Sequence, residues 1–284
     1  SGPHGTIYDR LVMEDFIPST PGDWTTTNLY RNGYQILWVP HWAAPTSCSD
    51  CPPGTTCPCQ NKYPAATIQQ ALRTIGAFGA AGKDIFAECA GLGSFEGVAG
   101  DADYGTAVAE THFQTVVPSP LSGALSINTS VSTTPIYQPG YFASPLMQLG
   151  DYPFIPRTGA IQNYRPAGTS TAYVTGGTDA TVRLISETNG GGAYDIFTHR
   201  PGLKTGHGAF VYLGGHSYSG TDGSFEVGGT RLVLNTLFNL GAGCTESGVA
   251  CDTGLLGTCG RGVFKCAADG STYCAQSQFP AAAE

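Results

Sequence analysis

The chain has 284 residues, of which 41% are hydrophobic, so it can bury one sizeable α/β core with a small appendage or two modest domains. Only 12% of the residues are charged, about half the usual share, and the net charge of −8 reflects a scarcity of lysines and arginines. Without a basic cluster we expect no nucleic-acid partner, and no apolar run approaches the roughly 18 residues of a membrane span.

The first third of the chain predicts alternating strands and helices. Residues 5–16 mix apolar and polar side chains and are expected to form a strand. Turn residues at 18–23 follow, and Asp23 is expected to cap a short helix that extends to Tyr30. The apolar run at 35–39 predicts a buried strand, which ends before Pro40, His41 and Trp42.

A second helix and strand lead to a cysteine. After an insertion rich in Pro and Cys at residues 43–62, the segment 64–79 has apolar residues at helical spacing. A buried strand is expected at 84–88, so Cys89 lies at its carboxyl end, where open α/β sheets bind ligands and carry out chemistry. Its small neighbours are Ala87, Ala90 and Gly91.

The remainder of the chain predicts an insertion, a last core unit and a tail. From about residue 98 to 200, short apolar runs between Gly, Pro, Ser and Thr indicate added strands and long loops. A buried strand at 209–213 ends in Gly214-Gly215-His216, and a helix is expected from 229 to 240. Residues 243–284 form a cysteine-rich tail.

We therefore predict an α/β fold in two parts. Residues 1–242 would form a mostly parallel sheet with flanking helices, in which the strands 35–39, 84–88 and 209–213 are neighbours. Residues 243–284 would form a small disulfide-held module with little regular structure.

The residues around Cys89 allow two interpretations. A nucleophile on a strand-to-helix elbow needs small neighbours because the backbone there is strained and crowded, and this pattern supplies them. The alternative is a small core cysteine, which is a common role for a cysteine outside a disulfide.

Several segments resemble the class I glutamine-amidotransferase-like proteins, which are flavodoxin-like, and the ThuA-like branch in particular. Val39-Pro40-His41-Trp42 corresponds to the oxyanion loop of that superfamily, and Ala87-Glu88-Cys89-Ala90-Gly91 to its nucleophile elbow, Gly-x-Cys-x-Gly. Tyr212-Leu213-Gly214-Gly215-His216 corresponds to the strand that ends in the catalytic histidine. The helix predicted at 229–240 follows in the expected order.

The resemblance implies a set of candidate site residues. Cys89 would be the nucleophile and His216 its base, with Glu88 or Glu96 as a nearby carboxylate. His41, or the backbone of Ala90 after the nucleophile, would stabilise an oxyanion. His216 could instead be a loop histidine bonded to a backbone carbonyl, and His41 could pack between two tryptophans.

This chain departs from the amidotransferase pattern at two positions. The family carries His-x-Glu, whereas Tyr218 stands two residues after His216. Position 87 is Ala rather than Gly. Because neither a glutamine-site signature nor a synthetase domain is visible, we do not expect glutamine amidotransferase activity.

Ten cysteines indicate an oxidising compartment. Four of them have the spacing C-x2-C-x5-C-x-C, which would suit a metal ion, but the interleaved prolines favour two disulfides. The tail cysteines repeat at regular intervals and resemble small disulfide modules of secreted bacterial surface proteins that carry metal-binding repeats. We expect disulfides among Cys48, Cys51, Cys57, Cys59, Cys244, Cys251, Cys259, Cys266 and Cys274.

Cysteine pairing bears directly on function. The five cysteines of the tail cannot all pair with one another, so either one remains unpaired or bonds to another chain, or Cys89 is consumed in a disulfide. Cys89 can act as a nucleophile only if it is not consumed in a disulfide, that is, if one tail cysteine stays unpaired or bonds to another chain.

Two functions follow as hypotheses. The first is a secreted or cell-surface protein, its signal peptide removed, that uses the amidotransferase-like domain as a structural subunit and self-associates into a homo-oligomer or filament. The scarcity of charge favours it, because fewer charges must be desolvated at subunit contacts. The alternative is a secreted cysteine-dependent hydrolase-like enzyme with a Cys89/His216 site that acts on a carbonyl, amide or sugar-derived substrate. Neither hypothesis requires a cofactor or a metal.

Overall fold

A computed structural model describes most of the α/β part of the chain and three strands of the tail. The described residues are 10–40, 63–99, 107–118, 123–128, 135–137, 146, 163–167, 172–175, 180–189, 192–200, 208–214, 230, 232–237, 240, 250–252, 261–266 and 272–276.

The described N-terminal residues form short helical turns. A 3-10 helix, η1 (Met13–Phe16), occupies part of the segment predicted as a strand, so that prediction is wrong there. The cause is local, because the Asp15 side chain accepts a hydrogen bond from the Val12 N–H at 2.7 Å and closes a turn. Asp23 caps a second 3-10 helix, η2 (Trp24–Thr26), and Thr27 caps α1 (Asn28–Arg31).

Three parallel strands form one end of the described sheet. The strands β1 (Ile36–Val39), β2 (Asp84–Glu88) and β8 (Phe210–Leu213) lie side by side in the order β1-β2-β8. Phe86 of β2 stands opposite Trp38 on one side and Val211 on the other. The prediction that these three segments are adjacent strands of one α/β sheet is confirmed.

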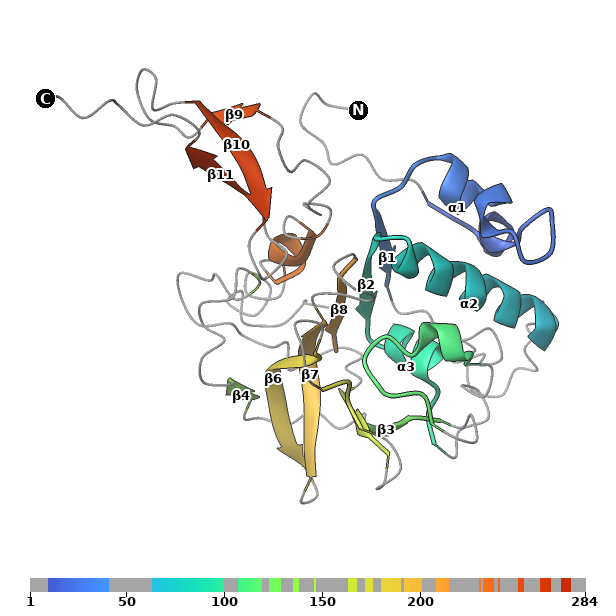
Figure 1. Ribbon diagram of the computed structural model, residues 1–284. Coiled ribbons are helices and arrows are strands. Elements are labelled where there is room, and N and C mark those ends of the chain that lie inside the picture. Colours follow the sequence, from blue (N-terminus) through green and yellow to red (C-terminus); the bar gives the residue numbers. More distant parts are fainter. Residues whose placement is uncertain are drawn as a thin grey trace, which may run out of the picture.

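Beyond β8 the sheet continues with antiparallel strands, so the whole eight-stranded sheet is mixed (Figure 1). β7 (Gly192–Arg200) pairs with β8, and the insertion after residue 98 supplies all the strands of this half. The others are β3 (Leu125–Asn128), β4 (Pro135–Tyr137), β5 (Asn163–Pro166) and β6 (Val182–Asn189).

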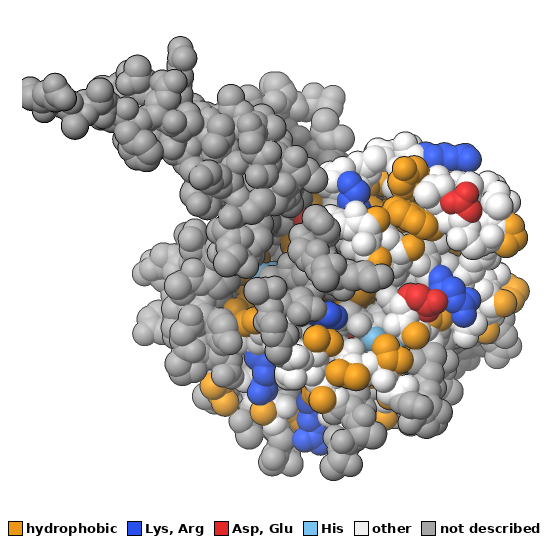
Figure 2. Space-filling view, viewed as in Figure 1, with side chains coloured by type: hydrophobic (Ala, Val, Ile, Leu, Met, Phe, Trp, Pro, Cys, Tyr) orange, Lys and Arg blue, Asp and Glu red, His pale blue; other side chains and the backbone are white. Residues whose placement is uncertain are grey.

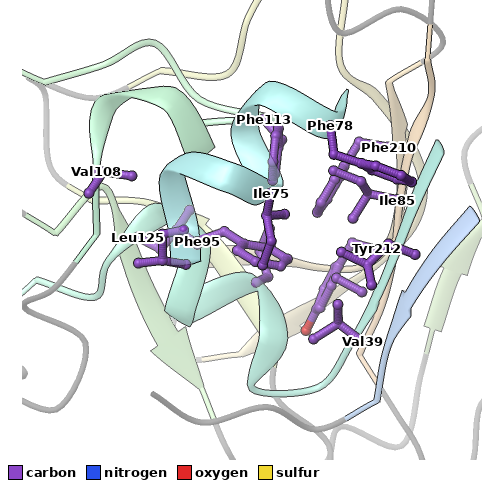
Figure 3. Close-up of a cluster of buried hydrophobic side chains, with 14 of the residues drawn as sticks. Val39, Ile75, Phe78, Ile85, Phe95, Val108, Phe113, Leu125, Phe210 and Tyr212 are labelled. Atoms are coloured by element: carbon purple, nitrogen blue, oxygen red, sulfur yellow. The ribbon is translucent and has the colours of Figure 1, made fainter. Parts of the chain in front are cut away.

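Helices cover both faces of the parallel strands. On one face α2 (Ala65–Ala80) buries the apolar stripe that its sequence predicts. Figure 3 shows Ile75 and Phe78 of this helix with Ile85, Phe210 and Tyr212 of the sheet. On the other face the helical residues 232–237 bring Leu232 and Val233 into the cluster around Phe86 and Val211.

The described part of the tail is a small antiparallel sheet of its own, in the order β11-β10-β9. Its strands are β9 (Ala250–Asp252), β10 (Arg261–Cys266) and β11 (Thr272–Gln276). The expectation of little regular structure is therefore wrong for these residues, because backbone pairing orders them as three strands. The nine cysteines predicted to form disulfides lie outside the residues whose side chains are described.

No helix among the described residues is both long enough and apolar enough to cross a membrane.

Candidate functional site

Cys89 occupies a strand-to-helix elbow. It follows β2 directly, and α3 (Gly91–Glu96) begins two residues later. Its φ of 50° makes it the one non-glycine residue with a positive φ in the described part of the chain. The Cys89 N–H donates to the Leu213 carbonyl at 2.9 Å, which fixes the elbow to the end of β8. The side chain is a thiol and is fully buried.

The small residues around Cys89 pack closely against one another. A Cβ on Gly91 would lie 3.5 Å from the Cβ of Ala87 and 3.3 Å from the carbonyl oxygen of Val39. Ala87 and Gly91, two residues before and two after the cysteine, therefore lie against each other across the elbow. Ala87, the departure from the amidotransferase pattern, fits because its methyl group meets a glycine.

Glu88 carries a buried carboxyl group and immediately precedes Cys89 in the chain. It is the last residue of β2 and only 2% exposed. The indole N–H of Trp38, on β1, donates to Glu88 Oε2 at 2.6 Å. The Trp38 ring also stacks on Phe86, with a centroid distance of 5.9 Å and an interplanar angle of 16°. The sequence predicts Glu88 as a site residue but gives no signal for its contact with Trp38, because the two residues lie 50 positions apart.

Glu96, the second candidate carboxylate, forms hydrogen bonds with Gln114 and Thr115. Its Oε1 accepts the backbone N–H of Gln114 at 2.6 Å. Its Oε2 accepts the Thr115 N–H at 3.1 Å and the Thr115 hydroxyl in a short hydrogen bond. This buried carboxylate therefore anchors residues 114–115 to the end of α3.

The same network includes the Nδ1 atom of His112. The single hydroxyl proton of Thr115 is donated to Glu96, so the hydroxyl oxygen must accept from His112 Nδ1–H, 3.0 Å away. His112 Nδ1 also lies 3.5 Å from Glu96 Oε2, and both side chains are fully buried. Within the described part of the chain, His112 Nε2 has no hydrogen-bond partner.

Of the remaining candidate residues, only Ala90 lies within the part of the chain that the structure describes. Ala90 is the N-cap residue of α3 and is buried beside Cys89, while its carbonyl accepts the Ser94 N–H. Glu88, Cys89 and Ala90 are consecutive residues at the carboxyl end of β2. His41 and His216 lie outside the described residues.

A third buried polar cluster lies in the antiparallel half of the sheet. The Tyr173 hydroxyl donates to Asp195 Oδ2, and Arg183 Nε contacts Asp195 Oδ1, each at 2.5 Å. Burial raises the pKa of Asp195 above its ordinary value of 3.8, although both partners act in the opposite direction. Burial, and then the Asp195 carboxylate, raise the pKa of Tyr173 well above 10.0.

This cluster predicts a pH dependence of stability. Above pH 3.8 the unfolded chain releases the Asp195 proton while the folded chain still holds it, so the free energy of unfolding should fall as the pH rises through this interval. Tyr173→Phe removes a hydrogen bond that lowers the pKa of Asp195, and should extend the fall to higher pH. Urea unfolding between about pH 3 and pH 7 measures this. Asp195→Asn should lack this component, and an unchanged profile in that variant would refute the assignment.

A groove of about 930 Å³ runs along α2. Its lining includes Trp24 of η2, Arg73 and Ala77 of α2, and Glu110 and Val116 on the opposite side. On the face shown in Figure 2, charged side chains are few and scattered among hydrophobic and uncharged polar ones.

Among the described residues, no group of three or more His, Cys, Asp or Glu side chains could hold a metal ion. No family model matches the chain, and a search of curated proteins finds no match either.

Proposed function

We propose that this chain is a thiol-dependent acyl-transfer or hydrolase enzyme with Cys89 as its nucleophile. The observation that supports this most is the positive φ of Cys89 between β2 and α3. A non-glycine residue in this conformation costs about 1–3 kcal/mol and persists only where the surroundings impose it. Here the hydrogen bond from Cys89 N–H to the Leu213 carbonyl and the close approach of Gly91 to Val39 support the backbone on both sides of Cys89. Backbone strain at the carboxyl edge of parallel strands is typical of nucleophile elbows.

The proposed reaction has two steps. The Cys89 sulfur attacks a substrate carbonyl carbon, an S–C bond forms, and the leaving group departs with a proton, which leaves a thioester on Cys89. Water then attacks the thioester carbon, and the thiol is restored as the acid product leaves. In this proposal Glu88 and His216 hold and move the protons, and the Ala90 backbone N–H or His41 stabilises the oxyanion.

The full burial of the thiol restricts how substrate arrives. Cys89 has no exposed surface, so a substrate must enter by displacing the atoms that enclose it. Once inside, the substrate carbonyl would be held away from bulk water, where electrostatic stabilisation of the oxyanion is strongest. We infer small carbonyl, ester, amide or sugar-derived substrates.

The test is acylation of Cys89 by p-nitrophenyl acetate. The folded chain should release a burst of about one p-nitrophenolate per molecule and carry one acetyl group on Cys89, which peptide mass spectrometry locates. Cys89→Ala should abolish the burst. A native chain that shows neither burst nor acetylated Cys89 would refute the proposal.

A matched pair of variants tests the strain itself. Cys89→Ala and Cys89→Gly both remove the thiol, but only glycine accepts a positive φ at no steric cost. The glycine variant should therefore exceed the alanine variant by about 1 kcal/mol in its free energy of unfolding. The opposite order would remove the main support for an elbow.

A second candidate function is a secreted, self-assembling structural subunit, which the complete enclosure of the Cys89 thiol favours. In that case the thiol is a core residue, and the sparsely charged surface makes the subunit contacts. Light scattering coupled to size-exclusion chromatography should then show oligomers that survive dilution and are unchanged by Cys89→Ala. A monomer at all concentrations would refute this candidate.

A further inference from the structure

We propose that Trp38 is a positioning residue for the Cys89 site and acts through the carboxyl group of Glu88. The inference rests on the proposed function and adds a residue from a different strand to it. Its basis is the 2.6 Å hydrogen bond from the Trp38 indole N–H to Glu88 Oε2.

The position of Trp38 follows from the register of the parallel strands. Trp38 stands opposite Phe86, and Glu88 is two residues further toward the carboxyl end of β2. Alternation along β2 puts the side chains of Phe86 and Glu88 on the same face. The indole stacks on the Phe86 ring and extends along this face, so that its N–H reaches the carboxyl group.

The hydrogen bond joins the partly exposed Trp38 ring to the buried carboxyl group of Glu88. Trp38 is 41% exposed, whereas Glu88 is 2% exposed. A buried carboxylate needs hydrogen-bond donors to offset its lost hydration, and a donor at this distance also restricts its rotamers. A core-packing role alone would not require an N–H at this point, because a phenyl ring would stack on Phe86 as well.

Restriction of the Glu88 carboxyl matters because of its place in the chain. Glu88 immediately precedes Cys89, and the regular alternation of strand faces ends with it, since Cys89 turns the backbone with a positive φ. In the proposed reaction Glu88 holds or moves a proton, and the indole N–H at Oε2 fixes the orientation of its carboxyl group. A carboxyl group that rotated out of this position would lose that function while the thiol stayed in place.

The test is a double-mutant cycle on the acylation burst. Trp38→Phe keeps an aromatic ring on Phe86 but removes the donor, and Glu88→Gln removes the carboxylate. If Trp38 acts through Glu88, Trp38→Phe should slow acylation about tenfold in the parent chain and have no further effect in Glu88→Gln. Trp24→Phe, which removes an indole N–H on η2, is the matched control and should leave the rate unchanged.

A spectroscopic measurement separates positioning from a merely structural role. The Trp38 indole N–H resonance, assigned by its absence from Trp38→Phe, should lie downfield in the parent chain and move upfield in Glu88→Gln. Equal slowing by Trp38→Phe in both backgrounds, or no slowing, would overturn the inference while the enzyme proposal stands. A parent chain with no burst would overturn both, because no reaction would then exist for Trp38 to support.

Discussion

Glu96→Ala should lower the free energy of unfolding by about 4 kcal/mol. The carboxylate is fully buried and accepts hydrogen bonds from the Gln114 N–H, the Thr115 N–H and the Thr115 hydroxyl. Alanine leaves these three donors without an acceptor in the interior, where each unsatisfied group costs about 1–3 kcal/mol, and relaxation recovers part of the sum. His112, 3.5 Å from the same carboxylate, loses its charged neighbour as well.

Urea unfolding measures this loss, and Glu110→Ala provides the matched control. Glu110 lies a few residues before Gln114 and Thr115, which Glu96 anchors. Its side chain is half exposed and forms an ion pair with Arg73, in which Nε and Oε1 are 3.6 Å apart. An exposed ion pair of this kind contributes about 0–1 kcal/mol, so its removal should barely change the urea midpoint. A loss in Glu96→Ala as small as that in Glu110→Ala would contradict the anchoring role. Glu96→Gln should fall between the two, because an amide can accept from one donor group but presents its own N–H to the other.

The hydrogen bonds of Glu96 also help to fix the position of α3, the helix that follows the elbow at Cys89. α3 starts just after Cys89 and ends at Glu96, so the two ends of one short helix are fixed separately. The Leu213 carbonyl holds the first end through Cys89, and residues 114–115 hold the second through the carboxylate. Of the two acidic residues proposed for the site, the structure therefore gives Glu96 a structural role, whereas Glu88 directly precedes Cys89 in the chain.

The parts of the fold that could be predicted are those whose signal is local. Residues 35–39, 84–88 and 209–213 are short apolar runs, and β2 and β8 are buried on both faces, so their sequences alone identify them as strands. The helix at 64–79 shows its period within its own sequence. The small residues around Cys89 predicted a crowded elbow for the same reason, since they are adjacent in the chain.

The parts that could not be predicted depend on distant partners or on a single side chain. β7 joins β8 antiparallel, and neither run of residues contains information about the direction of the other. The Trp38–Glu88 bond and the Glu96 network exist only once the sheet and α3 have brought these segments together. At the N-terminus, the Asp15 carboxylate competes with strand pairing and turns the segment into η1.

The need for glycine at position 123 could not be predicted from the sequence either, because it depends on a segment more than 20 residues away. A Cβ at Gly123 would lie 2.1 Å from the Val98 carbonyl carbon and 2.3 Å from the Ala99 nitrogen, both of them backbone atoms. Backbone hydrogen bonds next to this contact, from Ala124 N–H to the Glu96 carbonyl and from Leu125 N–H to the Gly97 carbonyl, hold the two segments together.

Gly123→Ala should therefore cost about 3 kcal/mol or more, because backbone cannot rotate away as a side chain can. Gly22→Ala is the informative control: Gly22 has a φ of +81° but open space around it, so only the cost of a left-handed conformation remains, about 1 kcal/mol. Urea midpoints of the two variants compare the effects directly. A Gly123→Ala chain as stable as Gly22→Ala would mean that the segments at 96–99 and 123–125 do not pack this closely. The position of α3, and with it the elbow at Cys89, would then need to be reconsidered.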